Sequence, residues 1–416
     1  MRVVAPFALA SITAVLATGA PPAARAADTT RNFEIYGFAM ADYIQDTKRV
    51  DPNWQDAFRP SRIAAPEGEF GTNGQASLSV KQSRFGVKGT LPTGDSTPPV
   101  NFKFEFDMFG VGADAGKTTI RLRHAYGEWG QLLAGQTHSL FMDIDVFPNV
   151  IDYWGPPGMV FFRNVQVRWT PYRTANDSLA FAIEKPSNDV DSGNIRLVQG
   201  FENFTVNPDQ PLPDFTGQFR HDDNWGHYQI AGILRRVGFQ YSNCPPNSDS
   251  GCAPVEPFQK GHQTGWGLDL TAAINTYDKD KVLLSVVHGQ GIASYMNDGG
   301  MDIAPTSMAE GPPTAEQVAS EAVPLTGVMA YYDHYWNSMW STSVGYSQTQ
   351  VANTSLQNTT AFHKGQYASV NLLMYPASRV MVGVELMYGK LTNNDGTTGD
   401  DVRFQFSAKY DFGAKL

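Results

Sequence analysis

Charged residues are scarce in this chain, and the charge that is present is acidic. Of the 416 residues, 17% are Asp, Glu, Lys or Arg, with 31 basic against 41 acidic side chains and a formal net charge of −10. Nucleic-acid binders carry an excess of basic residues, so the sequence excludes that class. A content of 12% aromatic residues also excludes intrinsic disorder, because disordered chains are poor in aromatics.

Long apolar runs are missing as well. Beyond the N-terminus no run of 18 or more apolar residues occurs, and the mean hydropathy is −0.30, so the sequence predicts no transmembrane helices. The chain is instead rich in glycine, with 39 residues. Its length fits two or three soluble domains or one large all-β unit.

Only two cysteines are present, Cys244 and Cys252, within a segment made of turn-forming residues. In an oxidising compartment they are expected to form a disulfide that closes a short loop. A metal site would need two more ligands nearby, and the next histidine, His262, stands alone. The sequence therefore supports a disulfide and no metal centre.

Residues 1–26 have the pattern of a secretory signal peptide. Arg2 precedes an apolar stretch at 3–20, and an Ala-Arg-Ala cleavage site follows at 24–26. The alternative is an uncleaved membrane anchor, which the prolines at 6, 21 and 22 disfavour. We expect one mature domain, residues 27–416, beyond the cytoplasm.

Alternation of apolar and polar residues, the signature of β-strands, dominates the rest of the chain. In residues 402–412 every second residue is apolar, from Val402 to Phe412. The same pattern predicts sixteen strands, at 33–45, 74–90, 99–109, 118–129, 131–138, 162–170, 178–185, 213–221, 226–240, 263–276, 281–290, 324–334, 338–350, 363–375, 379–391 and 402–412. A change of parity predicts a bulge near Gln82, Met381 and Met387 are apolar exceptions on a polar face, and only 314–322 suggests a helical period.

Short and long connections alternate between these strands. The long connections are 46–73, 139–161, 186–212, 241–262, 291–323 and 351–362, and such loops are uncommon in compact soluble domains. They are typical of outer-membrane barrels, which have short periplasmic turns and long external loops. Sixteen strands also make a barrel wide enough to enclose water, and aromatics near strand ends fit interfacial girdles. We therefore predict an all-β fold, a 16-stranded antiparallel transmembrane barrel.

Several stretches resemble trimeric porins of the outer membrane. These are Phe33–Gly37, Gln82–Gly89, Arg121–Gly130 and Leu133–Thr137. The stretch from Arg121 to Trp169 and that from Pro213 to Arg236 resemble the DcaP-like porins in particular. The resemblance implies a homotrimeric channel in the outer membrane of a Gram-negative bacterium, in contact with lipid and lipopolysaccharide. It also implies passage of small anionic solutes such as dicarboxylates.

In porins the third long loop folds into the barrel and narrows it, and we expect the same of 139–161. This loop has carboxylates at Asp143, Asp145 and Asp152 and a Gly-Pro-Pro-Gly turn at 155–158. Its apolar residues can pack against the barrel wall, whereas their exposure to water would cost free energy. The alternatives are an external lid and a loop that contacts a neighbouring subunit.

A basic cluster is expected to face these carboxylates across the lumen. Strand parity turns six basic residues inward, because an outward guanidinium near the membrane midplane costs roughly 2–4 kcal/mol. They are Arg84, Lys88, Arg121, Arg123, Arg168 and Arg235. Together with the loop they would set a transverse field that favours anions. The alternative for each is a water-solvated lumen residue without a role in selectivity.

Two other classes of protein remain as alternatives. An outer-membrane enzyme, such as a lipase or protease, would need a nucleophile and a base at the rim, and no Gly-x-Ser-x-Gly elbow occurs. A soluble secreted β-protein that binds carbohydrate would leave cells without detergent. Residues 116–118 resemble the end of a phosphate-binding loop but lack its first glycine, since Val111 stands there. We expect no cofactor, no nucleic acid and no catalysis.

Overall fold

The computed structural model describes residues 31–94, 96–194, 205–242, 260–308 and 318–415. The signal peptide predicted at 1–26 and the disulfide predicted between Cys244 and Cys252 lie outside these residues. Both therefore stay predictions.

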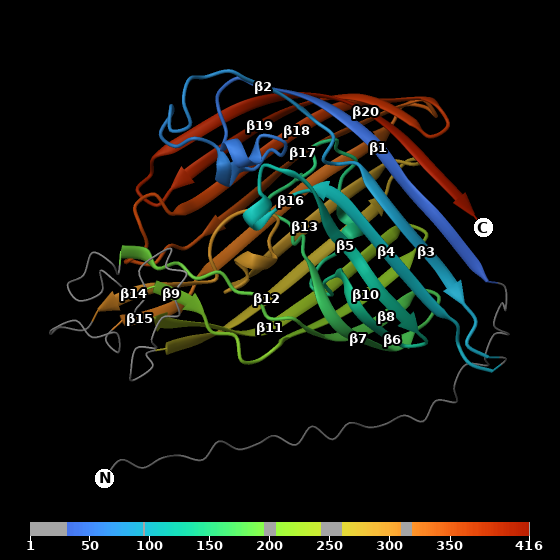
Figure 1. Cartoon of the computed structure of the whole chain (residues 1–416), viewed down its shortest axis with the longest axis horizontal. Coiled ribbons are helices and arrows are strands. Elements are labelled where there is room, and N and C mark those ends of the chain that lie inside the picture. Colours follow the sequence, from blue (N-terminus) through green and yellow to red (C-terminus); the bar gives the residue numbers. More distant parts are fainter. Residues whose placement is uncertain (1–30, 95, 195–204, 243–259, 309–317, 416) are drawn as a thin grey trace, which may run out of the picture.

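Sixteen strands of the described chain close into one antiparallel barrel (Figure 1). They are β1 (Asn32–Asp46), β3 (Arg84–Leu91), β4 (Val100–Phe109), β5 (Thr118–Trp129), β6 (Leu132–His138), β7 (Arg163–Arg173), β8 (Asp177–Glu184), β10 (Asp214–Asp223), β11 (Gly226–Ser242), β12 (Lys260–Asn275), β13 (Lys281–Gln290), β16 (Pro324–Tyr335), β17 (Trp340–Val351), β18 (Phe362–Ala377), β19 (Val380–Asn393) and β20 (Thr398–Lys415). Each pairs with the next, and β1 pairs with β20 from Glu34↔Lys415 to Asp46↔Arg403. That seam closes the sheet into a barrel, as a β-protein that spans a membrane requires.

Four further strands extend the barrel at one end. β2 (Gln75–Ser79) and β3 both pair with β1, and a turn at 80–83 separates them, in which the Ser83 amide donates to the Val80 carbonyl over 3.0 Å. The bulge predicted near Gln82 is thus a short interruption. β9 (Thr205–Pro208) pairs with β11, and β14 (Ile303–Met308) forms a hairpin with β15 (Val318–Ala322). The helical period suggested for 314–322 was wrong for 318–322, which form β15.

Helical structure is limited to single turns in the loops. Five 3₁₀ turns are described: η1 (Pro52–Trp54), η2 (Pro60–Arg62), η3 (Gly112–Asp114), η4 (Ile144–Val146) and η6 (Ala293–Tyr295). In the described ranges no helix has both the length and the apolar character to cross a membrane.

The two faces of each strand differ as the alternation predicts. Phe404 and Phe406 on β20 are each 40% exposed on the outside, whereas Gln405 and Ser407 between them are fully buried on the inside. Val384 and Leu386 on β19 likewise lie outside, on either side of the buried Glu385. Apolar side chains therefore cover the outer wall and polar ones the inner wall. This distribution suits a barrel surrounded by lipid.

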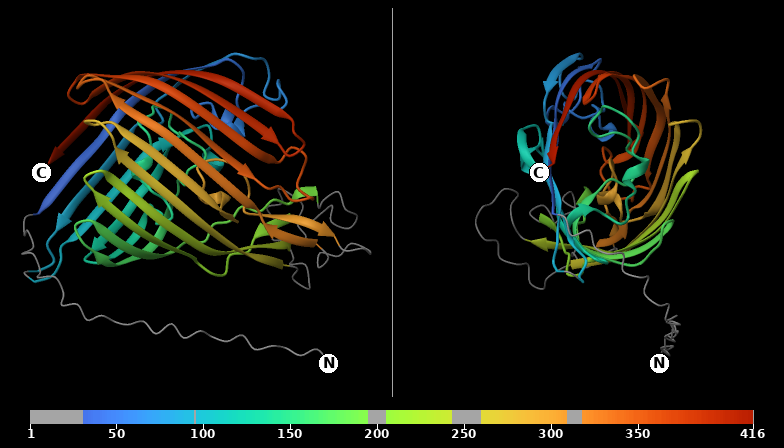
Figure 2. Two further views of the ribbon diagram at one scale, coloured as in Figure 1. Left: turned by 180° about the vertical axis from the view of Figure 1, so that it is seen from behind. Right: turned by 90° about the vertical axis from the view of Figure 1, so that its right-hand side faces the viewer.

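The connections sort by length to opposite ends of the barrel. At one end the turns are tight, as between β5 and β6, where Gly130 has φ +60°, a conformation that glycine adopts without steric cost. At the other end four long loops are L1 (47–74), L3 (139–162), L4 (185–213) and L6 (291–323). Figure 2 (right) shows the L3 ribbon inside the ring of strands.

Apolar residues on the inner wall mark where the loops pack. Met387 belongs to a buried cluster with Phe58 and Ile63 of L1 and Met159 of L3, and Met381 packs in a second cluster with Ile151 of L3. The methionines that broke the alternation in β19 therefore contact loops that enter the barrel. An inner wall bathed only in water would not need them.

Candidate functional site

L3 is fixed to strands β10, β11 and β12 by Asp143. The carboxylate of Asp143 accepts hydrogen bonds from Nε2 of His227 at 2.8 Å and from the Thr271 hydroxyl at 2.7 Å. Arg220 Nη1 lies 3.3 Å from the same carboxylate and 2.8 Å from Asp145. Asp143 is 2% exposed, so its charge is used to anchor the loop.

The middle of L3 contacts strands β16, β17 and β19. The Asn149 amide donates to the Asp333 carboxylate at 3.2 Å, and the Ile151 amide donates to Glu385 at 2.5 Å. The Gly158 amide donates to the Ser347 hydroxyl at 2.8 Å. A Cβ atom on Gly158 would lie 2.2 Å from the Gln348 carbonyl oxygen, so glycine in the predicted 155–158 turn is what allows this close approach. L3 thus crosses the lumen.

Asp152 is also an internal anchor. Its carboxylate accepts hydrogen bonds from the backbone amides of Phe58 at 3.0 Å, Trp154 at 3.1 Å and Gly155 at 2.9 Å. Burial raises the pKa of Asp152, and the nearby Arg403 and these amides oppose that rise. Of the three predicted loop carboxylates, only Asp145 is well exposed, at 57% of its side chain. The loop therefore does not present a row of three carboxylates to a basic wall.

The basic wall has its own carboxylates, Glu105 and Asp107 of β4. Arg121 pairs bidentately with Asp107, at 3.1 and 2.6 Å. Arg123 reaches Glu105 at 2.8 Å and Asp107 at 2.9 Å. Arg84 lies 3.6 Å from Glu105. The structure thus brings three of the six predicted basic residues together.

Lys103 adds a fourth cation to this group, 3.2 Å from Glu105. We call Arg84, Lys103, Arg121 and Arg123, with Glu105 and Asp107, the basic wall. Four cations against two carboxylates leave an excess of positive charge on the wall.

A bulge in β5 helps to build the basic wall. Register between β4 and β5 shifts from Glu105↔His124 to Phe106↔Leu122, which leaves Arg123 as the extra residue. Arg123 and His124 are consequently both buried on the inner side. A bulge places two successive side chains where regular alternation would place one.

Tyr153 joins L3 to the basic wall. Its hydroxyl donates to Asp107 at 2.8 Å and accepts from Arg123 Nη1 at 3.0 Å. The ring stacks on Phe109 with centroids 4.1 Å apart and an angle of 14°, and Arg121 lies over it at 5.3 Å. L3 is therefore held at this wall as well as at the strands that bind Asp143.

The other three predicted basic residues lie apart from the basic wall. Lys88 is 3.4 Å from Glu34 near the short-turn end. Arg168 donates to the His138 carbonyl at 2.7 Å and to Gln166 at 3.0 Å. Arg235 is paired with two carboxylates, Asp214 at 3.3 Å and Asp302 at 3.4 Å. Arg235 is 3% exposed and fastens L6 to the barrel.

Two of the cavities in the described protein are lined in part by L3. The larger, about 620 Å³, is lined by residues of L1, L3, L4 and L6 and by Arg121 and Arg163. The smaller, about 270 Å³, is lined by Arg84, Arg123 and Lys409 among others. Tyr153 and Phe161 line both cavities. These two rings therefore lie between the two cavities, and the boundary at Tyr153 and Phe161 is called the passage.

Three loops meet above this passage. The Arg59 guanidinium of L1 lies 4.2 Å from the Trp54 ring and 4.4 Å from the Trp154 ring of L3. It also donates to Asp298 of L6 at 3.0 and 2.8 Å. Burial lowers the pKa of Arg59, and Asp298 partly offsets this effect. Trp154 donates in turn to the Asn297 carbonyl at 2.6 Å.

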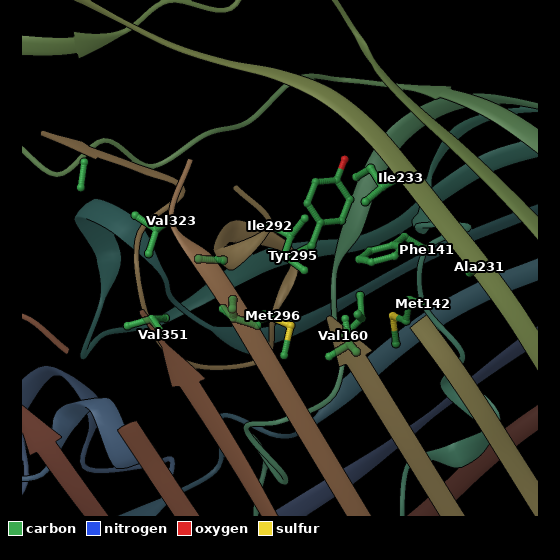
Figure 3. Packing of buried hydrophobic residues seen from close by; sticks show 14 residues of the cluster. Phe141, Met142, Val160, Ala231, Ile233, Ile292, Tyr295, Met296, Val323 and Val351 are labelled. Carbon is green, nitrogen blue, oxygen red and sulfur yellow. The ribbon is translucent and has the colours of Figure 1, made fainter. Parts of the chain in front are cut away.

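L3 and L6 also share an apolar contact. Figure 3 shows Phe141, Met142 and Val160 of L3 beside Tyr295 and Met296 of L6. The cluster continues on the inner wall through Ala231 and Ile233 of β11. L1, L3 and L6 therefore form one packed unit that lines the passage.

Sequence reasoning missed several residues of this site, namely Lys103, Glu105, Tyr153 and Arg59, and it left Arg163 without an orientation. The alternation of apolar and polar residues in β4 already predicted that Lys103 and Glu105 point into the barrel. The contacts of Arg59 and Tyr153 lie in irregular loops, where period 2 gives no information.

A closed barrel with an apolar exterior, a polar interior and a loop across its lumen defines the class of this protein. It has the fold of the outer-membrane porins, which reside in the outer membrane of Gram-negative bacteria. Residues 65–224 match the family described as DcaP outer membrane protein, which confirms the resemblance predicted from the sequence. No curated protein matches the chain.

Solved structures support the same fold. The outer membrane channel DcaP of Acinetobacter baumannii has a TM-score of 0.72 at 21% identity, covering 93% of this chain and 99% of that one. The anion-selective porin from Comamonas acidovorans has a TM-score of 0.57 at 10% identity, covering 92% and 100%. OmpT of Vibrio cholerae has a TM-score of 0.53 at 10% identity, covering 92% and 98%.

The comparisons also decide between the alternative classes. Porins are channels and not enzymes, which sets aside the outer-membrane lipase or protease. The soluble secreted carbohydrate-binding protein was expected to be a β-sandwich, and the closed 16-stranded barrel is not one.

Proposed function

We propose that this porin conducts small hydrophilic solutes by passive diffusion and prefers anions, including dicarboxylates. The observation that carries the proposal is the basic wall, in which four cations surround two carboxylates at the passage. A guanidinium binds a carboxylate through two parallel hydrogen bonds, so such a wall favours anionic solutes.

The mechanism differs from the transverse field expected from the sequence. Asp143 and Asp152 are engaged in hydrogen bonds within the protein. The acidic partners of the arginines in the basic wall are therefore the neighbouring Glu105 and Asp107. These carboxylates reduce the net charge of the basic wall and hold the guanidiniums in place. Binding at a partly neutralised wall is weak, and a channel needs weak binding because the solute must leave again.

L3 supplies the constriction in this proposal. It crosses the lumen between the two cavities and is held at several walls by Asp143, Asn149, Ile151 and Tyr153. A loop with so many anchors keeps a constant bore, which size discrimination requires. Passage then depends on solute size at Tyr153 and Phe161 and on charge at the basic wall.

Reversal potentials in a salt gradient across a planar bilayer test the charge preference. The wild type is expected to prefer anions, and Arg121→Ala combined with Arg123→Ala is expected to weaken that preference, because Asp107 loses both guanidinium partners. Arg173→Ala is the matched control, since Arg173 is 62% exposed at the end of β7 and pairs with Glu128. Equal cation preference in all three proteins would reject the proposed selectivity and leave the barrel intact.

We further propose that the protein assembles as a homotrimer and contacts lipopolysaccharide through its long-loop end. One structure of OmpT from Vibrio cholerae is described as a trimer form, which supports the trimer by likeness of fold. Light scattering of the detergent-purified protein before and after heat dissociation measures its oligomeric state. A monomer before heating would contradict the proposal.

A further inference from the structure

The guanidiniums that line the larger cavity differ in how they are neutralised. Arg59 donates from Nε and Nη2 to one oxygen of Asp298, and Arg121 is paired bidentately with Asp107. Arg62 lies 3.7 Å from Asp51. The fourth, Arg163, has no carboxylate within 4 Å among the described residues. Its positive charge is therefore the one in this cavity that the described protein leaves uncompensated.

Arg163 owes its position to a gap in the barrel wall. β5 and β6 pair only from Ala125↔Gln136 to Trp129↔Leu132, so the first part of β5 separates from its neighbour. The side-chain amide of Gln136 donates to the exposed Leu122 carbonyl at 3.0 Å. Arg163, which is paired with His138 at the start of β7, lines the larger cavity together with Leu122 and Gln136 of this region.

Parity alone would turn Arg163 outward, because Val165 and Val167 two and four residues later are exposed on the outer wall. The separation of β5 from β6 instead lets its side chain line the larger cavity together with Arg121 and Tyr153. Its guanidinium lies 5.4 Å from the Phe161 ring. The charge is thus located beside the aromatic passage.

One nitrogen of this guanidinium has no hydrogen-bond partner in the described protein. Nη1 of Arg163 is shielded from solvent and unpaired. A shielded donor without an acceptor is costly, and a charged one more so. An anion in the cavity supplies the missing negative charge, and it can bind the part of the guanidinium that lines the cavity.

We propose that Arg163 is the residue that captures anionic solutes in the larger cavity, by binding a carboxylate or phosphate group before the solute passes Tyr153. The inference rests on the proposed anion-preferring channel and assigns its first binding step to one residue. The solute then leaves Arg163 and binds Arg121 and Arg123. Asp107 and Glu105 partly neutralise the charges of these two arginines. This order moves the anion from an unneutralised cation to partly neutralised ones.

The larger cavity also has a carboxylate without an ion pair in the described protein, Asp189 of L4. Burial and the neighbouring Asp302 raise the pKa of Asp189, while Arg235 opposes the shift. Removing this carboxylate should act in the opposite sense to removing Arg163. Asp189→Asn therefore removes a negative charge from the same cavity from which Arg163→Gln removes a positive charge.

The experiment measures single-channel block by inorganic phosphate and the reversal potential in a salt gradient, both on the full chain in planar bilayers. Arg163→Gln is expected to shorten the phosphate residence time roughly tenfold or more, since a charge-assisted hydrogen bond is lost. Arg163→Lys keeps the charge without the planar fork, so it should preserve the reversal potential and restore the residence time only in part. Asp189→Asn should lengthen the residence time, and Arg173→Gln should change neither quantity.

The outcomes separate the inference from the proposed function. A wild type that prefers anions, with Arg163→Gln indistinguishable from it in both measurements, overturns the role of Arg163 and leaves the anion channel standing. A wild type without anion preference overturns the proposed function, whereas loss of phosphate block in Arg163→Gln alone would still support capture at this residue. Channels that open with normal frequency in Arg163→Lys show that the position tolerates substitution.

Discussion

The hydroxyl of Tyr153 donates a hydrogen bond of 2.8 Å to Asp107, across the boundary between a loop and the barrel wall. Asp107 is fully buried and also accepts from Arg121 and Arg123. One carboxylate thereby holds two arginines of the basic wall and the ring that narrows the passage. The charge preference and the bore of this porin are consequently coupled through Asp107.

Tyr153→Phe tests this coupling. The ring can remain stacked on Phe109, but the hydrogen bonds to Asp107 and Arg123 are lost, each of about 1.5–3 kcal/mol for a charged partner. We expect brief conductance transitions to become roughly tenfold more frequent, because each 1.4 kcal/mol corresponds to a factor of ten. Single-channel recordings at fixed voltage provide the measurement.

Tyr153→Ala should act differently from Tyr153→Phe. Loss of the ring widens the passage between the two cavities, so the mean conductance should rise. Tyr335→Phe removes a hydroxyl from a tyrosine near the short-turn end of β16 and is the matched control. If conductance transitions were as rare in Tyr153→Phe as in this control, the hydroxyl would have no part in holding the loop.

The barrel was predictable from the sequence because strand parity has a short and regular period. The predicted segments 118–129 and 281–290 coincide with β5 and β13, and the outward Phe404 and Phe406 follow the alternation. The small strands β9, β14 and β15 were missed, since they are short and extend the loops. Period 2 needs several residues before it can be recognised.

The site was only half predictable for a physical reason. Parity turns Arg84, Arg121 and Arg123 inward, as expected, but it carries no information about which strand lies opposite. The partners of these arginines depend on the register of β4 against β5 and on the bulge at Arg123. The loop carboxylates Asp143 and Asp152 could not be told from pore-lining groups, because their anchoring partners are distant in the sequence.

Asp143→Asn is expected to loosen L3 from β10, β11 and β12. The amide cannot accept from His227, Thr271 and Arg220 as a buried carboxylate does, and removal of one partner of a buried charge pair costs about 3–5 kcal/mol. The midpoint of thermal unfolding should fall, and the open-channel current should become noisier. Asp145→Asn is the control, because Asp145 is half-exposed and has one ion pair to Arg220.

If Asp143→Asn kept the wild-type unfolding midpoint and current noise, the apolar contacts of Phe141 and Met142 would hold the loop by themselves. A drop of similar size in both variants would point instead to Arg220 as the source of the effect. Circular dichroism on heating and bilayer recordings of the same preparation distinguish these cases.

Asp46 and Arg403 close the barrel seam from the inside. They are direct partners in the pairing of β1 with β20, and the guanidinium binds the carboxylate at 2.6 and 2.9 Å. Both side chains are buried, and Phe58 of L1 lies over Arg403 at 5.0 Å. Asp46→Asn should destabilise the barrel by about 3–5 kcal/mol, because the buried Arg403 guanidinium loses the carboxylate to which it is hydrogen-bonded.

The paired variant Asp46→Leu with Arg403→Leu provides the control. It removes both charges together, and replacing a buried ion pair by apolar residues is often neutral or stabilising. Thermal midpoints of the folded form, read from its faster migration on unheated gels, compare the variants. Equal midpoints for Asp46→Asn and the wild type would show that the seam depends on backbone pairing alone.

Leu386→Arg examines the orientation on which the membrane assignment depends. Leu386 is 50% exposed on the outer wall in the middle of β19, while the adjacent Glu385 is buried inside. A guanidinium at the bilayer midplane should lower stability by about 2–4 kcal/mol, against about 0–1 kcal/mol near the interface. Met339→Arg, in the short turn between β16 and β17, is therefore the control with the same incoming charge. The fraction of folded barrel recovered in lipid vesicles should fall for Leu386→Arg and not for Met339→Arg. Equal recovery of the two variants would mean that Leu386 does not face the acyl chains.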